Sequence, residues 1–257
     1  IIYVNAGIIL KILINCGNIV TKFVNDKVDL IMANATPALQ AAAAATGDIP
    51  ILGTSVTEYG VALDIKDFDG TVGGNISGTS DLAPLDQQAA MVKEWFPNAK
   101  EVGLIYCSSE ANSKYQVDVV KAELEKAGLT ATLYSFSDSN DLSSVCTVAA
   151  DKSDVIYVPT DNTVASNAEL INNICLPANV PIIAGEEGIC KGCGVATLSI
   201  SYYDLGYTTG QMAVKILRDG ADISTMPIEY TTTTKKYNQA MCDALGIAPI
   251  EGYVVIE

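Results

Sequence analysis

Short apolar runs alternate with segments of helical periodicity along most of the chain. The runs are rich in Val, Ile and Leu, which is typical of strands that are buried on both faces. They predict strands at 29–34, 49–55, 101–107, 130–136, 155–158, 180–188 and 194–201. The segments between them predict helices at 37–45, 81–96, 112–128, 141–150, 165–175 and 203–220. This alternation indicates an α/β fold whose parallel sheets are covered by helices.

Capping residues set the predicted starts of two helices. Thr36 is expected to cap the helix that Pro37 opens, because hydroxyl side chains satisfy free backbone N–H groups and proline suits the first helical position. Asp81 is expected to cap the helix that follows it. Residues 70–80 are glycine-rich and predicted to be extended, and they lack the Gly-Lys-Ser/Thr ending of a phosphate loop. Residues 231–237 are predicted to form an edge strand that leads to a solvated turn.

Two segments of the chain share one plan. Residues 29–52 and 154–183 each contain an Asp, an apolar strand, a Thr at the carboxyl end of that strand, a helix, and a second apolar run after a proline. Thr36 and Thr160 take the same place in the two segments. The shared plan predicts two domains of similar α/β design.

Polar side chains gather where the predicted strands end, and ligands of open α/β sheets bind beyond the carboxyl ends of the strands. The candidate binding residues are Thr36, Ser55, Thr57, Asn112, Thr160, Asp161, Asn162, Glu186, Ser201 and Tyr202. Among these candidates, hydroxyl groups dominate in the first half of the chain and suit a carboxylate, whereas the carboxylates, Asp161 and Glu186, come only from the second half and suit an ammonium group. The pattern predicts a small zwitterion bound between two halves.

Two of these residues have a structural alternative. Asp161 could simply cap the helix that follows it, as Asp does in many α/β turns. The neighbouring acidic strand end at Glu186 favours a cationic partner instead, because two close carboxylates repel each other unless a cation lies between them. Tyr202 could belong to the core or to the wall of a pocket.

Composition excludes several classes of function. Of the 257 residues 49% are hydrophobic, yet no run approaches the roughly 20 apolar residues that a membrane-spanning helix needs. The formal net charge of −15 argues against a nucleic-acid partner, because phosphates are neutralised by clustered Lys and Arg. The chain has no His, which excludes Ser–His–Asp and Cys–His catalysis. No cofactor is expected.

The seven cysteines are scattered along the chain. Cys190 and Cys193 alone have suggestive spacing, but a zinc site would require a second such pair, so a local disulfide or two free thiols is expected. Cys107 ends a predicted strand and is the best candidate nucleophile of a rival enzyme, although it has no His partner. We therefore expect a protein that is not an enzyme. An α/β enzyme acting on an amino-acid-like substrate, or a ligand-sensing domain, is the alternative.

Five stretches carry a resemblance to a known family. They are LIMANATPALQAAAAAT, GGNISGTSDLAP, IYVPTDNTVAS, IIAGEEG and SISYYDLGYTTGQMAVKIL. The region from about 18 to 248 resembles the ABC-transporter substrate-binding proteins of the tryptophan-binding-protein-like family, which have the type I periplasmic-binding-protein fold. The resemblance implies two Rossmann-like lobes with parallel sheets, joined by a three-segment hinge and closing on one ligand. It also implies a bacterial transport protein that binds an aromatic amino acid such as tryptophan.

The resemblance implies further properties. The protein is expected to be extracytoplasmic, either periplasmic or lipid-anchored at the cell surface, monomeric, and a partner of a membrane permease. The lobes are expected at 1–80 with 203–227 and at 81–202 with 228–257. The turn at Thr36, the loop from Ser55 to Thr57, the turn at 160–162 and Glu186 match cleft-lining segments of the family. The family's first strand and helix are expected to be missing, and residues 7–16 are predicted to form a strand or short buried helix instead.

Overall fold

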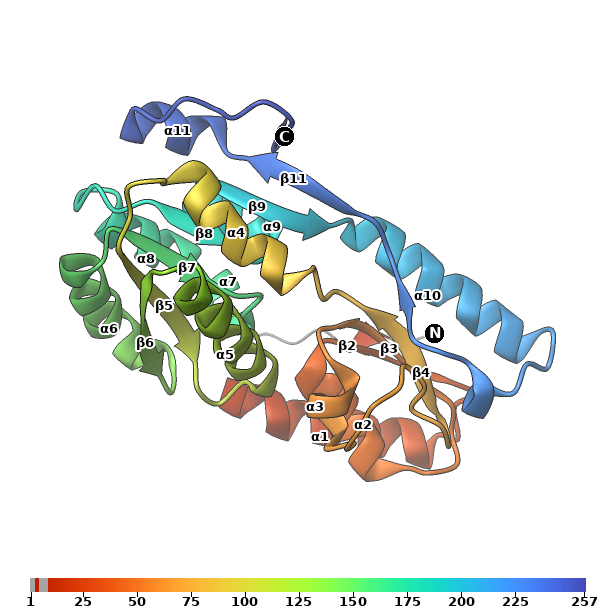
Figure 1. Cartoon of the computed structure of the whole chain (residues 1–257). Helices are drawn as coiled ribbons and strands as arrows, with labels where there is room; N and C mark the ends of the chain where they lie inside the picture. The colour runs from red at the N-terminus through yellow and green to blue at the C-terminus, as the bar shows by residue number, and fades with distance from the viewer. Residues whose placement is uncertain (1–2, 5–8) are drawn as a thin grey trace. The chain divides into compact units, whose positions relative to one another are not determined.

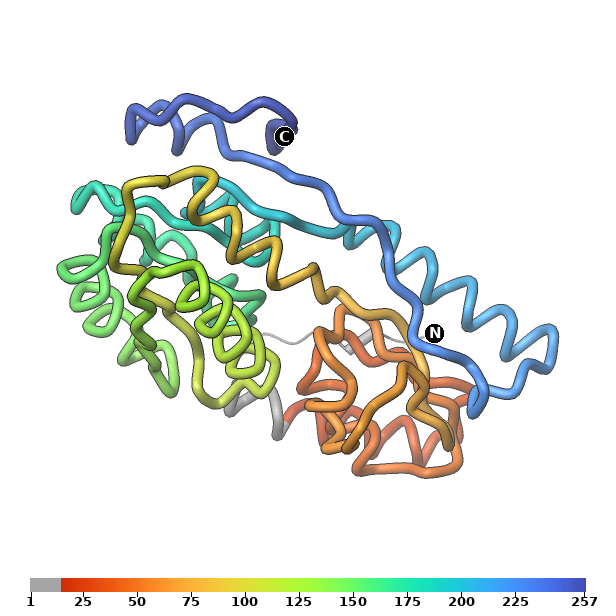
Figure 2. The backbone as a smooth tube through the Cα atoms, viewed as in Figure 1, coloured from red at the N-terminus to blue at the C-terminus, as the bar shows by residue number. Residues whose placement is uncertain are grey.

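The computed structural model describes residues 3–4 and 9–257, with side chains from residue 15 onward (Figure 1). The chain divides into two compact units. Unit 1 comprises Ile1–Leu82 and Ser201–Thr232, and unit 2 comprises Ala83–Ile200 and Thr233–Glu257. The chain therefore passes from one unit to the other three times, and this path can be followed by residue number in Figure 2.

Unit 1 is built on a parallel sheet of five strands. These are β1 (Tyr3–Val4), β2 (Ile31–Asn34), β3 (Ile51–Val56), β4 (Ile76–Ser80) and β10 (Glu229–Tyr230). They lie in the order β1-β2-β3-β4-β10, and every neighbouring pair is parallel. The predicted parallel α/β design is confirmed for this unit.

Helices cover both faces of this sheet because successive strand side chains point to opposite sides. Ile31 and Ala33 of β2 pack with α1 (Ile9–Asn25), α2 (Thr36–Ala45) and α3 (Tyr59–Leu63). Leu30 and Met32 pack instead with α10 (Tyr202–Leu217), and Ile223 of the short 3-10 helix Ile223–Thr225 joins them. Figure 1 shows α10 on the face opposite α1, α2 and α3. The continuous apolar run of β2 is thus explained by burial on two sides.

Unit 2 is built on a sheet of seven strands. In spatial order these are β12 (Val254–Val255), β11 (Thr233–Tyr237), β9 (Ala196–Ile200), β8 (Ile182–Ala184), β7 (Val155–Val158), β5 (Glu101–Cys107) and β6 (Thr130–Phe136). All neighbouring pairs are parallel except β11 and β9, which are antiparallel. The parallel prediction therefore holds for this sheet with one exception.

The helices of unit 2 lie on both faces of its sheet. They are α4 (Leu85–Trp95), α5 (Ala111–Lys126), α6 (Ser139–Lys152), α7 (Asn162–Ala165), α8 (Ala168–Cys175), α9 (Glu187–Cys193) and α11 (Gln239–Leu245). Figure 1 shows α4 and α5 in front of the sheet and α8 and α9 behind it. Gln88 of α4 fixes this packing: its amide donates to the carbonyls of Gly185 and Leu198 at 3.0 and 3.1 Å, and its Oε1 accepts from the Tyr157 hydroxyl at 2.6 Å.

Both predicted helix caps are wrong. Thr36 lies inside α2, and the cap position belongs to Ala35, whose N–H still pairs with the carbonyl of Thr54 at 2.9 Å in the sheet. Asp81 does not cap α4, which begins at Leu85. Proline disfavours helical geometry in the residue before it, so the helix starts only after Pro84.

Three other predicted elements differ from the structure. The predicted helix at 165–175 is two helices, α7 and α8, because Asn167 leaves helical geometry and its amide caps the carbonyl of Thr163 at 2.7 Å. The segment 231–237 is not an edge strand, since β11 pairs with β9 on one side and β12 on the other. Residues 9–16 belong to α1, and residues 7 and 8 of that predicted segment lie outside the described residues.

Within residues 9–257, no helix is both long enough and apolar enough to cross a membrane. All seven cysteines are described, buried and free of disulfides. Cys190 and Cys193 lie on α9, so the choice between a local disulfide and two thiols is resolved in favour of thiols.

Candidate functional site

The strand ends of unit 1 carry strained backbone. Ala35 follows β2 with φ 73° and ψ 159°, and Ser55 near the end of β3 has φ 54°. Side-chain-bearing residues rarely adopt positive φ, and such strain concentrates at functional sites. The predicted residues Thr36 and Thr57 lie beside these two positions, and both are buried. The local geometry therefore marks the carboxyl edge of this sheet as a candidate site.

Asp81 joins this edge although it was not among the predicted binding residues. Its backbone N–H donates to the carbonyl of Val56 at 3.2 Å, which fixes it beside the end of β3. The carboxyl group is buried, and burial raises its pKa to about 6 despite the hydroxyls of Thr57 and Tyr202, which favour the charged form. The Tyr202 hydroxyl donates to Asp81 Oδ2 at 3.2 Å.

The start of α10 supplies the other predicted residues of unit 1. Ser201 caps the helix, since its hydroxyl oxygen accepts from the N–H of Asp204 at 3.2 Å. Tyr202 is 38% exposed and contacts Asp81, so it does not belong to the core, and its place in a pocket wall stays a prediction. The structure thus brings Thr57, Asp81 and Tyr202 together in unit 1.

In unit 2 the Asp161 carboxylate binds backbone N–H groups. Oδ1 accepts from Val164 at 2.9 Å and caps α7, while Oδ2 accepts from Cys107 at 2.7 Å. The side chain is 1% exposed. Burial raises the pKa of Asp161 to about 7, and the negative charge of Glu110 adds to the shift. The geometry therefore gives Asp161 a clear structural role, and binding of an ammonium group by it stays a prediction.

Glu110 is a second buried acid that sequence reasoning missed. Its Oε2 accepts from the backbone N–H and the side-chain amide of Asn162 at 3.0 and 2.7 Å. Its Oε1 accepts from the N–H and hydroxyl of Thr163, both at 2.9 Å. Its place directly before α5 and after the end of β5 was the available signal, because polar residues there face the carboxyl edge.

Thr160 is held by two amides of α5. Asn112 and Gln116 donate to its carbonyl at 3.1 and 2.9 Å, and its own N–H donates to Gln116 Oε1 at 3.0 Å. Its hydroxyl contacts the carbonyl of Gly185 at 3.4 Å. The predicted residues Asn112, Thr160, Asp161 and Asn162 are therefore assembled in one network of unit 2.

Glu186 lies at the next strand end and caps α9. Its Oε2 accepts from the N–H of Gly188 at 2.7 Å, and its Oε1 accepts from the N–H of Ile189. The side chain is buried. Like Asp161, it stabilises a helix N-terminus, and its predicted role towards a ligand stays untested.

The candidate nucleophile Cys107 lies in the same region. Its thiol contacts the hydroxyl of Ser109 at 3.0 Å, and burial raises the pKa of the thiol. Thiolate is the nucleophilic form, so this environment opposes covalent catalysis. Among residues 15–257, no group of three His, Cys, Asp or Glu side chains is arranged to hold a metal ion.

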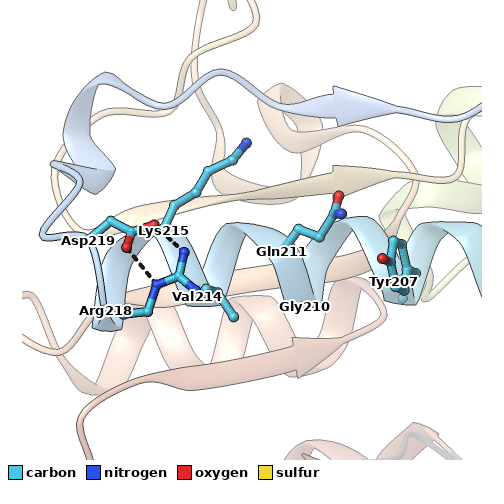
Figure 3. A pocket seen from close by; sticks show the side chains of 8 residues that line it. Tyr207, Gly210, Gln211, Val214, Lys215, Arg218 and Asp219 are labelled. Carbon is cyan, nitrogen blue, oxygen red and sulfur yellow. Dashed lines mark hydrogen bonds and ion pairs between the residues drawn. The ribbon is translucent and has the colours of Figure 1, made fainter.

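A surface depression lies elsewhere on unit 1, along α10 (Figure 3). Its lining residues are Gly206, Tyr207, Gly210, Gln211, Val214, Lys215, Arg218 and Asp219. Arg218 Nε and Nη2 pair with the Asp219 carboxylate at 2.6 and 2.9 Å, and Figure 3 shows this pair at one end of the depression. None of the predicted binding residues lines it, so the depression is distinct from the candidate site.

Solved structures share this fold. A structure of an ABC domain in complex with L-Trp, from Streptococcus pneumoniae, is 34% identical with a TM-score of 0.89, covering 95% of this chain and 84% of that one. A conserved domain protein from Vibrio cholerae is 29% identical with a TM-score of 0.89 and the same coverage. The predicted type I periplasmic-binding-protein fold is confirmed by this agreement.

A curated relative and a family model give the same assignment. The tyrosine-binding protein of Clostridioides difficile is 39% identical over 211 residues, which is 82% of this chain. The match spans only 61% of that relative's length. The family described as ABC transporter substrate binding protein matches residues 10–251. The chain therefore belongs to the family of ABC transporter substrate-binding proteins, as its sequence motifs predict.

Proposed function

We propose that this protein binds an aromatic amino acid, such as tyrosine or tryptophan, for uptake by an ABC importer. The observation that carries the proposal is the similarity, over 95% of the chain, to a structure determined in complex with L-Trp. The relative named for tyrosine binding supports the same ligand class. Ligands of this class carry a carboxylate, an ammonium group and a flat apolar ring.

The polar strand ends support recognition of such a ligand. In the proposal, the hydroxyls of Thr36 and Ser55 bind the carboxylate, Thr57 supports the Asp81 carboxylate, and Tyr202 contacts the ring. Asn112 and the 160–162 turn contribute further hydrogen bonds. The idea that groups from both units bind one ligand remains a prediction. Ser55→Ala tests the carboxylate contact, because loss of a hydrogen bond to a charged group costs roughly 10- to 100-fold in affinity.

We propose binding without turnover. The pKa of the Cys107 thiol is raised, which makes it a poor nucleophile, and the sequence contains no His to act as its base. Both observations support this view. Family membership supports an extracytoplasmic location and a membrane permease as partner. A lipid anchor and a monomeric state complete the proposal.

A thermal-shift screen against the twenty amino acids tests the function. A ligand at 100 times its dissociation constant stabilises the folded protein by about 2.7 kcal/mol, which is a shift of several degrees. We expect L-Tyr, L-Trp or L-Phe to raise the melting temperature and their D-enantiomers to have little effect. Recovery of unchanged amino acid by chromatography after incubation separates binding from turnover. No shift with any aromatic amino acid would overturn the proposal.

A further inference from the structure

Four acidic side chains are buried among residues 15–257, and one of them differs from the rest. In Glu110, Asp161 and Glu186, each carboxylate oxygen accepts at least one N–H or O–H donor from the protein. In Asp81, Oδ2 accepts from Tyr202, whereas Oδ1 is fully enclosed and has no hydrogen-bond partner among the described residues.

An enclosed carboxylate oxygen without a donor is costly. The penalty for leaving a buried acceptor unsatisfied is about 1–3 kcal/mol, and more when the group is charged. With a pKa of about 6, Asp81 is mostly ionised at neutral pH. None of the ion pairs in the part of the chain with described side chains includes it. The hydroxyls of Thr57 and Tyr202 leave Oδ1 without a donor within hydrogen-bond distance, so the carboxylate calls for a further partner.

The position of Asp81 indicates what kind of partner that is. It follows β4, at the carboxyl edge where ligands of α/β sheets bind, and it neighbours the strained end of β3. Two hydroxyl groups, those of Thr57 and Tyr202, interact with it. The charge of Asp81 adds to the burial that raises the pKa of the Tyr59 phenol, so Tyr59 stays neutral, and its hydroxyl donates to the carbonyl of Thr79 at 3.1 Å.

We infer that Asp81 binds the ammonium group of the amino-acid ligand, with Oδ1 as the acceptor. The inference rests on the proposed function and deepens it by naming the group that selects for an α-amino acid. An ammonium group donates charge-assisted hydrogen bonds, which are shorter and stronger than neutral ones. It would supply both the missing donor and the missing positive charge. Asp161 and Glu186 are then helix caps in this protein rather than ammonium ligands.

The experiment compares each amino acid with its analogue that lacks the amino group. Affinities of the wild type and of Asp81→Asn are measured by calorimetry at pH 7.5, using L-tryptophan with indole-3-propionate and L-tyrosine with 3-(4-hydroxyphenyl)propionate. We expect Asp81→Asn to weaken amino-acid binding by at least about 30-fold. Binding of the propionates should stay within about threefold of the wild type, because they have no ammonium group to lose.

Two comparison variants make the result specific. Asp48→Asn makes the same chemical change at an exposed position of unit 1 and should leave the wild-type preference for the amino acid intact. Asp161→Asn should lower the affinities for amino acid and propionate alike, if it lowers them at all. Collapse of the preference in Asp161→Asn, with its retention in Asp81→Asn, would overturn the inference.

Failure of the two proposals can be told apart. If the wild type binds none of L-tryptophan, L-tyrosine and L-phenylalanine, the proposed function and this inference both fall. If it binds them and Asp81→Asn keeps the preference, only the inference falls. Should Asp81→Asn not fold, a crystal structure of the wild type with L-tryptophan decides the matter. A ligand nitrogen within about 3.2 Å of Asp81 Oδ1 supports the assignment, and a nitrogen bound elsewhere contradicts it.

Discussion

The carboxylate of Glu110 accepts two hydrogen bonds from Asn162, one from the backbone N–H at 3.0 Å and one from the side-chain amide at 2.7 Å. The residues are 52 positions apart in the sequence, yet this contact joins the start of α5 to the start of α7. This buried acid accepts from Asn162, from Thr163 and, at 3.4 Å, from the side-chain amide of Asn112, so it organises the turn that also contains Asp161.

Replacing Glu110 with Gln should destabilise unit 2. The amide would place N–H donors against the N–H groups of Asn162 and Thr163, and a lost charge-assisted hydrogen bond costs about 1.5–3 kcal/mol. Urea denaturation followed by circular dichroism measures the free energy of unfolding. Glu251→Gln, at an exposed position, is the matched control and should change it by less than about 0.5 kcal/mol. Equal stability of the two variants would show that the network contributes little.

Stability should depend on pH through Asp81. Its folded pKa of about 6 lies above the ordinary aspartate value of 3.8, so the folded state binds the proton more tightly than the unfolded state. The resulting stability is fully present below pH 3.8 and is lost as the pH rises through about 6. Asp81→Asn does not titrate, so its stability relative to the wild type should rise between pH 4 and 7.5, by about 3 kcal/mol at most.

Urea denaturation of both proteins at half-unit steps of pH measures this difference. Asp161→Asn should show a difference of the same sign that extends to higher pH, since the pKa of Asp161 is raised to about 7. A difference between wild type and Asp81→Asn that is flat from pH 4 to 7.5 would mean that Asp81 is not buried as an ionisable group.

Removing the hydroxyl of Tyr157 should weaken the packing of α4. In Tyr157→Phe, Oε1 of Gln88 loses its donor while remaining buried, which costs about 1–2 kcal/mol of unfolding free energy. Differential scanning calorimetry measures the change. Tyr203→Phe removes a hydroxyl from a side chain that is 80% exposed and should be neutral. A neutral Tyr157→Phe would indicate that another donor reaches Gln88.

Gly78 permits close contact between β3 and β4. A Cβ atom there would lie 2.1 Å from the carbonyl oxygen of Gly53, and the φ angle of 148° already disfavours a side chain. Gly78→Ala should therefore destabilise unit 1 by several kcal/mol, because backbone must move to admit the methyl group. In Gly47→Ala the new atom meets nothing within 4 Å, and we expect little change. Thermal denaturation of the pair measures the contrast, and similar midpoints would contradict the close approach.

The local sequence pattern predicted the strands better than it predicted where the adjoining helices begin and which strands pair. β5 and β6 have the predicted bounds, since each is rich in aliphatic and aromatic residues and is bounded by turn residues. The caps at Thr36 and Asp81 were wrong because strand pairing at Ala35 and the proline at 84 decide where those helices begin. The partner β12, which makes β11 an inner strand, has only 2 residues and carries no local signal.

The candidate site shows the same limit. Strand-end position sufficed to select Thr57, Asp161 and Tyr202, since the carboxyl edge of a parallel sheet is a general binding location. Strand-end position could not distinguish a carboxylate whose two oxygens both accept hydrogen bonds from one with an oxygen that has no donor. That distinction depends on contacts such as Tyr202 with Asp81, across 121 residues of sequence.

The discontinuity of both units bears on the synthesis of the chain. The sheet of unit 1 is completed by β10, and that of unit 2 by β11 and β12, all of which lie beyond residue 228. A ribosome that has made the chain up to residue 200 has therefore finished neither sheet. Both lobes depend on the same later stretch of polypeptide, so the nascent protein keeps unpaired strand edges until the residues beyond 228 have been made.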